Sequence, residues 1–169
     1  FAPDTFSSYL GAHIEWNENS RETIWVEPFV KNWNDVEIKF DPNSFWWQKT
    51  TDFLRAFRKR FDGRAILVPP NIQGGLDCLS AIRGVNELLM DIIDCPKKVT
   101  RALKQVSVAV QQVQCAYKEI LDPDIGYMNR HMMYSNQMTD VPQCDFSCMI
   151  STDMFNEFQM PVLEEEMNG

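Results

Sequence analysis

The feature that most constrains the fold is a long apolar stripe between Pro96 and the acidic turn "DPD". Its members recur every three or four positions, as the buried face of an α-helix requires; they are Val99, Leu103, Val106, Val110, Val113, Tyr117 and Ile120. Pro96 stands where a first helical position is expected, because proline fits the first turn of a helix. We therefore predict a long core helix that carries no chemical signal of its own.

The rest of the sequence divides at about residue 42. Residues 1–42 hold every tryptophan but two and the β-like runs "AHIEW" and "ETIWVEPFV", separated by the turn-forming "NENS". These runs predict a Trp-rich β excursion. Residues 43–169 alternate between short apolar runs and helical periods. We expect strands at "RAILVPP" and "VPQCDF" and helices at 43–62, 76–84 and 86–94.

Strand and helix in alternation are typical of a parallel α/β sheet or barrel. We expect a single domain, since 169 residues are enough for one real core. The net charge of −8 opposes nucleic-acid binding, and Arg58–Arg60 is interpreted as a solvated helix face. No apolar run approaches the roughly 20 residues of a membrane span, and we expect no signal peptide. Five scattered cysteines favour reduced thiols, so we predict a cytoplasmic protein that binds no membrane.

Two loops after predicted strands are candidate sites, because active sites of such folds lie at the carboxyl ends of the strands. In the first, Gly74 and Gly75 lead into a helix whose N–H groups and dipole favour an anion. A tight turn into the helix is the alternative. In the second, Asp145 is a candidate general base or anchor for a substrate N–H, with Ser147 beside it.

The sequence gives weaker support for other kinds of functional site. Cys144, Cys148 and His131 have spacing that zinc tolerates, but no second ligand pair follows, so we predict no metal site in this chain. His131 is either a proton donor or a satisfied structural residue. The tryptophan pair Trp46–Trp47 suits either sugar rings or core packing, and we favour the core.

The closing segment predicts a helix that follows the second loop. Ser151 or Thr152 is its expected N-cap. Pro161 lies inside the helical pattern and should kink or interrupt it. The run "EEE" at Glu164–Glu166 is interpreted as a solvent-exposed face.

The sequence resembles the uroporphyrinogen decarboxylase-like superfamily from about Ala65 to its end. In "GGLDCLSAIRGVNELLMDIIDCPKKVTRALKQV" the resemblance is carried by Arg83, Gly84, Asp91 and Pro96. In "DFSCMISTDMFNEFQMPVLEEEM" it is carried by a second set, namely Ile150, Ser151, Phe155, Phe158 and Pro161. The superfamily has a (β/α)₈ barrel of about 250 residues, so the resemblance implies that this chain is an internal portion of such a TIM barrel.

The resemblance also implies an activity. Its two main branches decarboxylate the acetate side chains of a tetrapyrrole or transfer methyl groups to or from corrinoid or thiol acceptors. Ser80 or Ala81 stands where the decarboxylases carry a tyrosine. The methyltransferases hold zinc with a His-x-Cys pair and a later Cys, all expected beyond residue 169. Zinc and a corrinoid are therefore cofactors only under that branch.

We expect a decarboxylase-like enzyme that acts on a small-molecule substrate. Its predicted catalytic residue is Asp145, and the predicted substrate-binding residues are Gly74, Gly75, Ser80, Arg83, His131 and Ser147. The alternatives are the zinc-dependent methyltransferase and a non-catalytic binding or assembly module. Partners under these hypotheses are another copy of the chain or the missing half of the barrel, because an open half-barrel leaves unpaired strand edges.

Overall fold

The computed structural model describes residues 4–15, 24–61, 63–121 and 126–168, and helices dominate this part of the chain. The elements in chain order are α1 (Thr5–Tyr9), β1 (His13–Glu15), β2 (Trp25–Glu27), α2 (Phe45–Phe61), α3 (Gly75–Arg83), α4 (Val85–Asp94), α5 (Pro96–Leu121), β3 (Tyr127–Met128), β4 (Tyr134–Ser135), the 3₁₀ helix η1 (Asp145–Met149), α6 (Thr152–Met154), the π-helical segment η2 (Phe155–Gln159) and α7 (Met160–Asn168).

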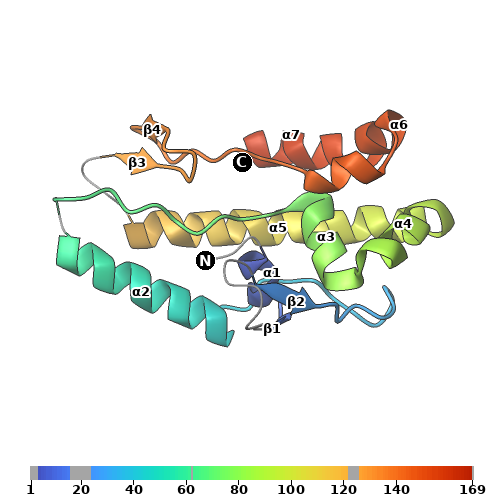
Figure 1. Cartoon of the computed structure of the whole chain (residues 1–169), viewed down its shortest axis with the longest axis horizontal. Coiled ribbons are helices and arrows are strands. Elements are labelled where there is room, and N and C mark those ends of the chain that lie inside the picture. Colours follow the sequence, from blue (N-terminus) through green and yellow to red (C-terminus); the bar gives the residue numbers. More distant parts are fainter. Residues whose placement is uncertain (1–3, 16–23, 62, 122–125, 169) are drawn as a thin grey trace.

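The long helix α5 is the centre of the fold (Figure 1). In this view α2 lies on one side of α5 and α7 on the other, and both contact it. Helices α3 and α4 pack against α5 towards its N-terminal end. The predicted stripe is confirmed, because all of its members are buried except the half-buried Ile120, and the helix begins at Pro96.

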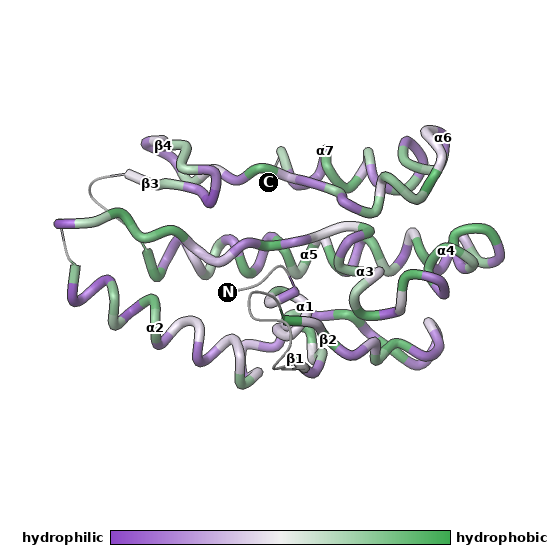
Figure 2. The backbone as a smooth tube through the Cα atoms, viewed as in Figure 1, coloured by the Kyte–Doolittle hydropathy of each residue, from purple (hydrophilic) through white to green (hydrophobic). Residues whose placement is uncertain are grey.

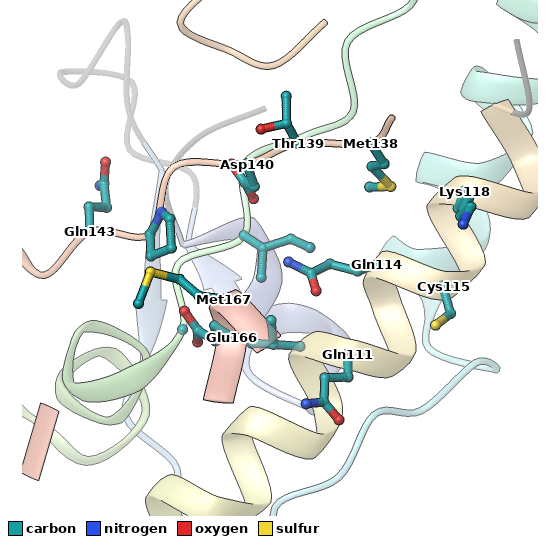
Figure 3. A pocket seen from close by; sticks show the side chains of 14 residues that line it. Gln111, Gln114, Cys115, Lys118, Met138, Thr139, Asp140, Gln143, Glu166 and Met167 are labelled. Carbon is teal, nitrogen blue, oxygen red and sulfur yellow. The ribbon is translucent and has the colours of Figure 1, made fainter. Parts of the chain in front are cut away.

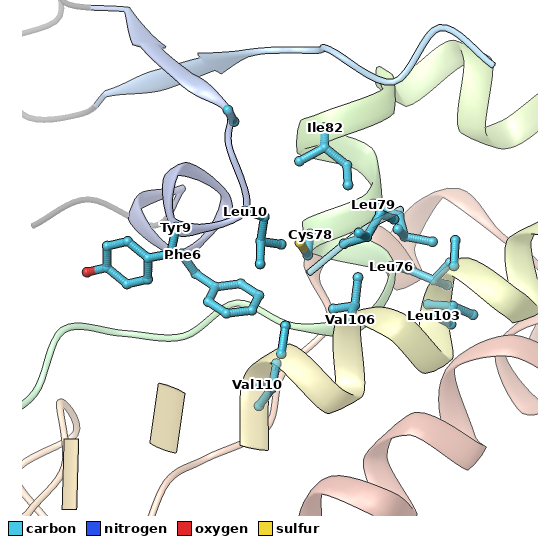
Figure 4. Packing of buried hydrophobic residues seen from close by; sticks show 14 of the residues in the cluster. Phe6, Tyr9, Leu10, Leu76, Cys78, Leu79, Ile82, Leu103, Val106 and Val110 are labelled. Carbon is cyan, nitrogen blue, oxygen red and sulfur yellow. The ribbon is translucent and has the colours of Figure 1, made fainter. Parts of the chain in front are cut away.

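The core joins α1, α3 and α5 (Figure 4). The rings of Phe6 and Tyr9 on α1 lie in the same buried cluster as Leu79 of α3 and Val106 of α5. The buried hydroxyl of Tyr9 lies 3.0 Å from the hydroxyls of both Thr50 and Tyr117, so this polar group is paired inside the core. The hydropathy of α5 agrees with its place in the core, since green apolar positions recur at intervals along its tube in Figure 2.

The predicted β-rich N-terminal excursion is wrong as a whole, because the described part of residues 1–42 holds one helix, two three-residue strands and otherwise irregular chain. Strands β1 and β2 pair antiparallel, with His13 opposite Glu27 and Ile14 opposite Val26. The predicted turn "NENS" lies outside the described residues. Residues 1–42 do not stand apart, because α1 packs on α2 and α3, and β2 packs on α3.

The predicted parallel α/β architecture, part of a TIM barrel, is wrong for this structure. The sheets in the described chain are two antiparallel pairs, β1–β2 and β3–β4, and no barrel closes. The run "RAILVPP" is extended but pairs with no strand among these residues, and Leu67 packs on the hydrophobic core instead. The run "VPQCDF" is irregular and enters η1 at Asp145. Short apolar runs fit a half-buried extended segment as well as a buried strand.

The other helices follow their sequence patterns. Helices α2, α3 and α4 are confirmed within a few residues of the predicted ranges. Among the described residues, no helix is both long enough and apolar enough to cross a bilayer. All five cysteines are free thiols.

A polar network fixes the junction between α3 and α4. Gly84 separates the two helices with a φ of +104°, a conformation that favours glycine. Nε of Arg83 donates to Asp91 at 2.7 Å, and its Nη1 donates to the carbonyls of Val30 and Lys31. The indole of Trp33 also donates to Asp91, at 2.7 Å. The pKa of Asp91 lies below its ordinary value. Burial alone would raise this pKa, but the hydrogen bonds from Arg83 and Trp33 have the larger combined effect and lower it.

Candidate functional site

The start of α3 is fixed to η1 by the carboxylate of Asp77. The backbone N–H of Asp145 donates to one oxygen of Asp77 at 2.9 Å, and that of Phe146 donates to the other at 2.8 Å. Asp77 is buried, with 9% of its surface exposed. Burial raises its pKa, although these two hydrogen bonds favour the charged form. The carboxylate therefore satisfies the first N–H groups of η1, which have no partner within that short helix.

A second contact comes from the π-helical segment before α7. Gln159, which is 1% exposed, accepts a hydrogen bond from the backbone N–H of Leu76 at 2.9 Å. Gly75 has a φ of +53°, and a Cβ at this position would lie 2.5 Å from the amide of Gln159. Only glycine therefore allows this close approach.

The predicted disturbance at Pro161 takes a specific form. The helix does not end there, because α7 runs from Met160 to Asn168, but the π-helical η2 precedes it directly. Ser151 is the N-cap, as predicted, since its hydroxyl accepts the N–H of Met154 at 3.2 Å. The wide turn aims Gln159 at α3, and π-helical turns of this kind are frequent at functional sites.

A cavity of about 530 Å³ lies beside these contacts (Figure 3). It is enclosed by the loop before α3, one face of α5, the segment 138–143 and the last turns of α7. Its polar lining consists of Gln111, Gln114 and Lys118 of α5, Thr139, Asp140, Gln143 and Glu166. The α5 residues are spaced three and four apart, so they project from one side of the helix.

Glu166 is the carboxyl with the most perturbed environment in this cavity. Its Oε1 is buried without a hydrogen-bond partner and lies against Gly74, where a Cβ would collide with it. Burial raises the pKa of Glu166 to about 7, and the carboxylates of Asp140 and Glu165 add to the effect. Near neutral pH this side chain can therefore both give and accept a proton, as a general acid or base must.

Of the residues that the sequence predicts for the site, Gly74 lines this cavity, and Gly75 lies behind it against Gln159. The N–H of Leu76 at the predicted anion site is already bonded to Gln159. Asp145 and Ser147 are exposed on η1 and are not part of the cavity lining. Their predicted roles stay predictions.

The remaining predicted residues lie elsewhere. The hydroxyl of Ser80 donates to the carbonyl of Asp77 at 2.8 Å, within α3. Arg83 belongs to the α3–α4 junction. His131 is exposed near β4, where its Nε2 accepts a bond from Arg130 at 3.1 Å. The structure thus brings Gly74, Gly75 and Asp145 to the start of α3 but leaves Arg83 and His131 away from them.

No group of three His, Cys, Asp or Glu side chains is placed to hold a metal ion in the part of the chain that the structure describes. Burial raises the pKa of the Cys144 thiol to about 12, and the charge of Asp77 adds to this. Such a thiol stays protonated and is a poor ligand. The two residues of the tryptophan pair have different environments. Trp47 packs between Phe40 and Tyr117 in the core, whereas Trp46 is 39% exposed.

Two site residues were missed from the sequence. Asp77 has only the ordinary signature of an acid in the first turn of a helix. Glu166 was assigned to the solvent face because of the "EEE" run, and this was wrong, since Oε1 is buried. A signal was available: Phe158, Val162 and Glu166 follow one another at intervals of four, and the first two are buried.

Replacement of Asp77 by Ala should destabilise the fold by about 1–3 kcal/mol, because the buried N–H groups of η1 would lose their acceptor. Urea unfolding followed by tryptophan fluorescence measures this. Asp145→Ala is the control, since it removes an exposed carboxylate and leaves the backbone bonds in place; it should change stability by less than about 0.5 kcal/mol. Equal effects of the two substitutions would contradict the assignment.

Replacement of Glu166 by Gln should stabilise the protein at high pH. Because the folded pKa of about 7 exceeds the ordinary 4.5, the folded state loses stability as pH rises from 4.5 through 7. The amide removes that loss, and we expect a gain of about 1–3 kcal/mol at pH 8 and almost none at pH 4. Thermal unfolding at the two pH values measures it. Glu157→Gln, at an exposed position of η2 that does not contribute to the shift, is the control, and a pH-independent effect of Glu166→Gln would contradict the account.

Comparison with known protein families, with curated proteins and with solved structures finds no match to this chain.

Proposed function

We propose that this chain binds a small carboxylic acid in the cavity beside Glu166 and exchanges a proton with it, as a decarboxylase-like enzyme of the class that the sequence resembles. The observation that carries the proposal is the unpartnered carboxyl of Glu166, whose pKa is raised to about 7 by burial. The cavity of about 530 Å³ supports it, because small-molecule sites typically measure about 300–1,000 Å³.

Decarboxylation needs such a proton donor. The carbon–carbon bond to the substrate carboxylate breaks, carbon dioxide leaves, and the electron pair stays on the remaining carbon. That carbon then takes the proton of Glu166 as a new carbon–hydrogen bond, and the Glu166 carboxylate regains a proton from water. The reaction therefore requires the protonated form of Glu166, and its rate should fall as pH rises through about 7.

The opposite wall of the cavity suits the substrate carboxylate. Lys118 supplies a cation, and the amides of Gln111 and Gln114 supply N–H donors from the same side of α5. Lys118 is the one cationic side chain in the lining, as far as the described residues go. Uroporphyrinogen carries many carboxylates, so this charge balance favours a smaller acid over a tetrapyrrole.

The sequence also suggested a methyltransferase and a binding module, and the cavity supports these two proposals less than it supports a decarboxylase. A zinc-dependent methyltransferase would need metal ligands and a corrinoid from outside this chain, and nothing in the cavity favours it. A non-catalytic binding module would use the same cavity without turnover. Release of carbon dioxide separates a decarboxylase from both of them.

The test is release of carbon dioxide from a panel of isotopically labelled acids, ranging from uroporphyrinogen to small mono- and dicarboxylic acids. Glu166→Gln keeps the size of the side chain but cannot donate an acidic proton, so kcat should fall about 10²–10⁴-fold. Asp145→Asn is the comparison, because Asp145 is the catalytic residue that the sequence predicts; on this proposal it keeps its rate. Full activity of Glu166→Gln, or loss only in Asp145→Asn, would reject the role of Glu166.

A further inference from the structure

Helix α2 carries an aromatic stripe on its outer side, formed by Trp46, Phe53, Phe57 and Phe61. These side chains are between 39% and 53% exposed, whereas the core contacts of α2 are made by others, such as Trp47 and Leu54. The ring centroids of Phe53 and Phe57 lie 6.1 Å apart, and those of Phe57 and Phe61 lie 6.3 Å apart, so the apolar surface is continuous. Exposed apolar patches of this kind mark sites of interaction.

The charge of α2 is opposite to that of the chain. The helix has five cationic side chains and one acidic one, a net charge of +4, and the remaining residues therefore carry −12 of the total of −8. On the helical wheel Lys49 and Arg60 border the aromatic stripe. A complementary surface must therefore combine apolar contact with negative charge.

Such a surface lies on the outer side of α6, η2 and α7. Asp153, Glu157 and Glu164 are exposed there, on the side opposite the buried Phe158 and Val162, and Pro161 lies exposed among them. Figure 1 shows α2 and α7 on opposite sides of α5. One chain therefore presents a basic aromatic face and an acidic face that point in different directions.

We propose that the aromatic stripe of α2 binds a second copy of this chain on its acidic α6–α7 face. An anionic membrane or nucleic acid would also attract α2, but the chain as a whole repels such surfaces with its net charge of −8. Because the two faces differ, the contact is heterologous, and copies join head to tail into a closed ring or an open chain. Salt should weaken the contact, since its rim is ionic.

Sedimentation equilibrium of the full chain tests the proposal. The wild-type protein should form species heavier than the monomer, with a Kd that rises at least tenfold between 50 mM and 500 mM salt. Lys49→Glu/Arg60→Glu should abolish association, and so should Glu157→Lys/Glu164→Lys. Arg55→Glu/Lys59→Glu makes the same charge change on the other side of α2 and should retain it. Circular dichroism confirms that each variant is folded.

Mixing gives the sharpest result. Each of the two interface variants retains one intact face, because one is altered on α2 and the other on α7. An equimolar mixture should therefore associate again, through the two unaltered faces and also through the two reversed faces, whose charges are once more complementary. A monomeric wild-type protein, variants that associate as the wild type does, or a mixture that stays monomeric would each overturn the proposal. If a monomeric wild-type protein instead binds phosphatidylglycerol vesicles through the stripe, the partner is a membrane and the proposal is wrong.

Discussion

The structure depends on the contacts made around the first turn of α3. Three segments that are far apart in the sequence meet there: Asp77 holds the start of η1, Gln159 accepts the N–H of Leu76, and Glu166 lies against Gly74. Helix N-termini leave N–H groups without partners, and Asp77 and Gln159 supply acceptors for η1 and α3. If these three side chains were absent, η1 and η2 would lose their hydrogen bonds to α3, and α7 would lose its contact with Gly74 at the cavity.

The same arrangement explains the electrostatics of the cavity. The glycine at position 74 allows Oε1 of Glu166 to approach the backbone so closely that no water-exposed position remains for it. Burial raises the pKa of Glu166 to about 7, and the negative charges of Asp140 and Glu165 add to the effect. Lys118, Gln111 and Gln114 line the cavity from α5. A proton donor and a binding group for an anion thus share one cavity, which is the combination that our proposed reaction requires.

The sequence predicted the local structure well and the long-range structure poorly. The periodic stripe of α5, the glycine that separates α3 from α4 and the Ser151 cap depend on residues close together in the chain, so pattern alone identified them. The apolar run "RAILVPP" was misassigned because the run itself does not show whether it pairs with a strand or packs on the hydrophobic core, as Leu67 does. The Asp77 contact joins residues 68 and 69 positions apart and leaves no local signal.

The motif that carries the sequence resemblance acts structurally in this fold. Arg83 and Asp91 form an ion pair at 2.7 Å, Gly84 provides the positive φ between helices, and Pro96 begins α5. These roles account for the spacing of the motif without any catalytic function. The chemistry that we propose for the candidate site comes instead from Glu166, which sequence patterning assigned to solvent and which the packing of α7 on α5 and beside Gly74 identifies.

The most direct test of the account is the titration of the Glu166 side chain, followed by NMR of protein labelled with ¹³C at the glutamate carboxyl carbons and assigned with Glu166→Gln. The account predicts a carboxyl resonance that titrates with a pKa of about 7, well above the ordinary value of 4.5, and that disappears in the variant. A Glu166 resonance that titrates near 4.5 would show a solvated carboxylate and would contradict the proposed proton donor.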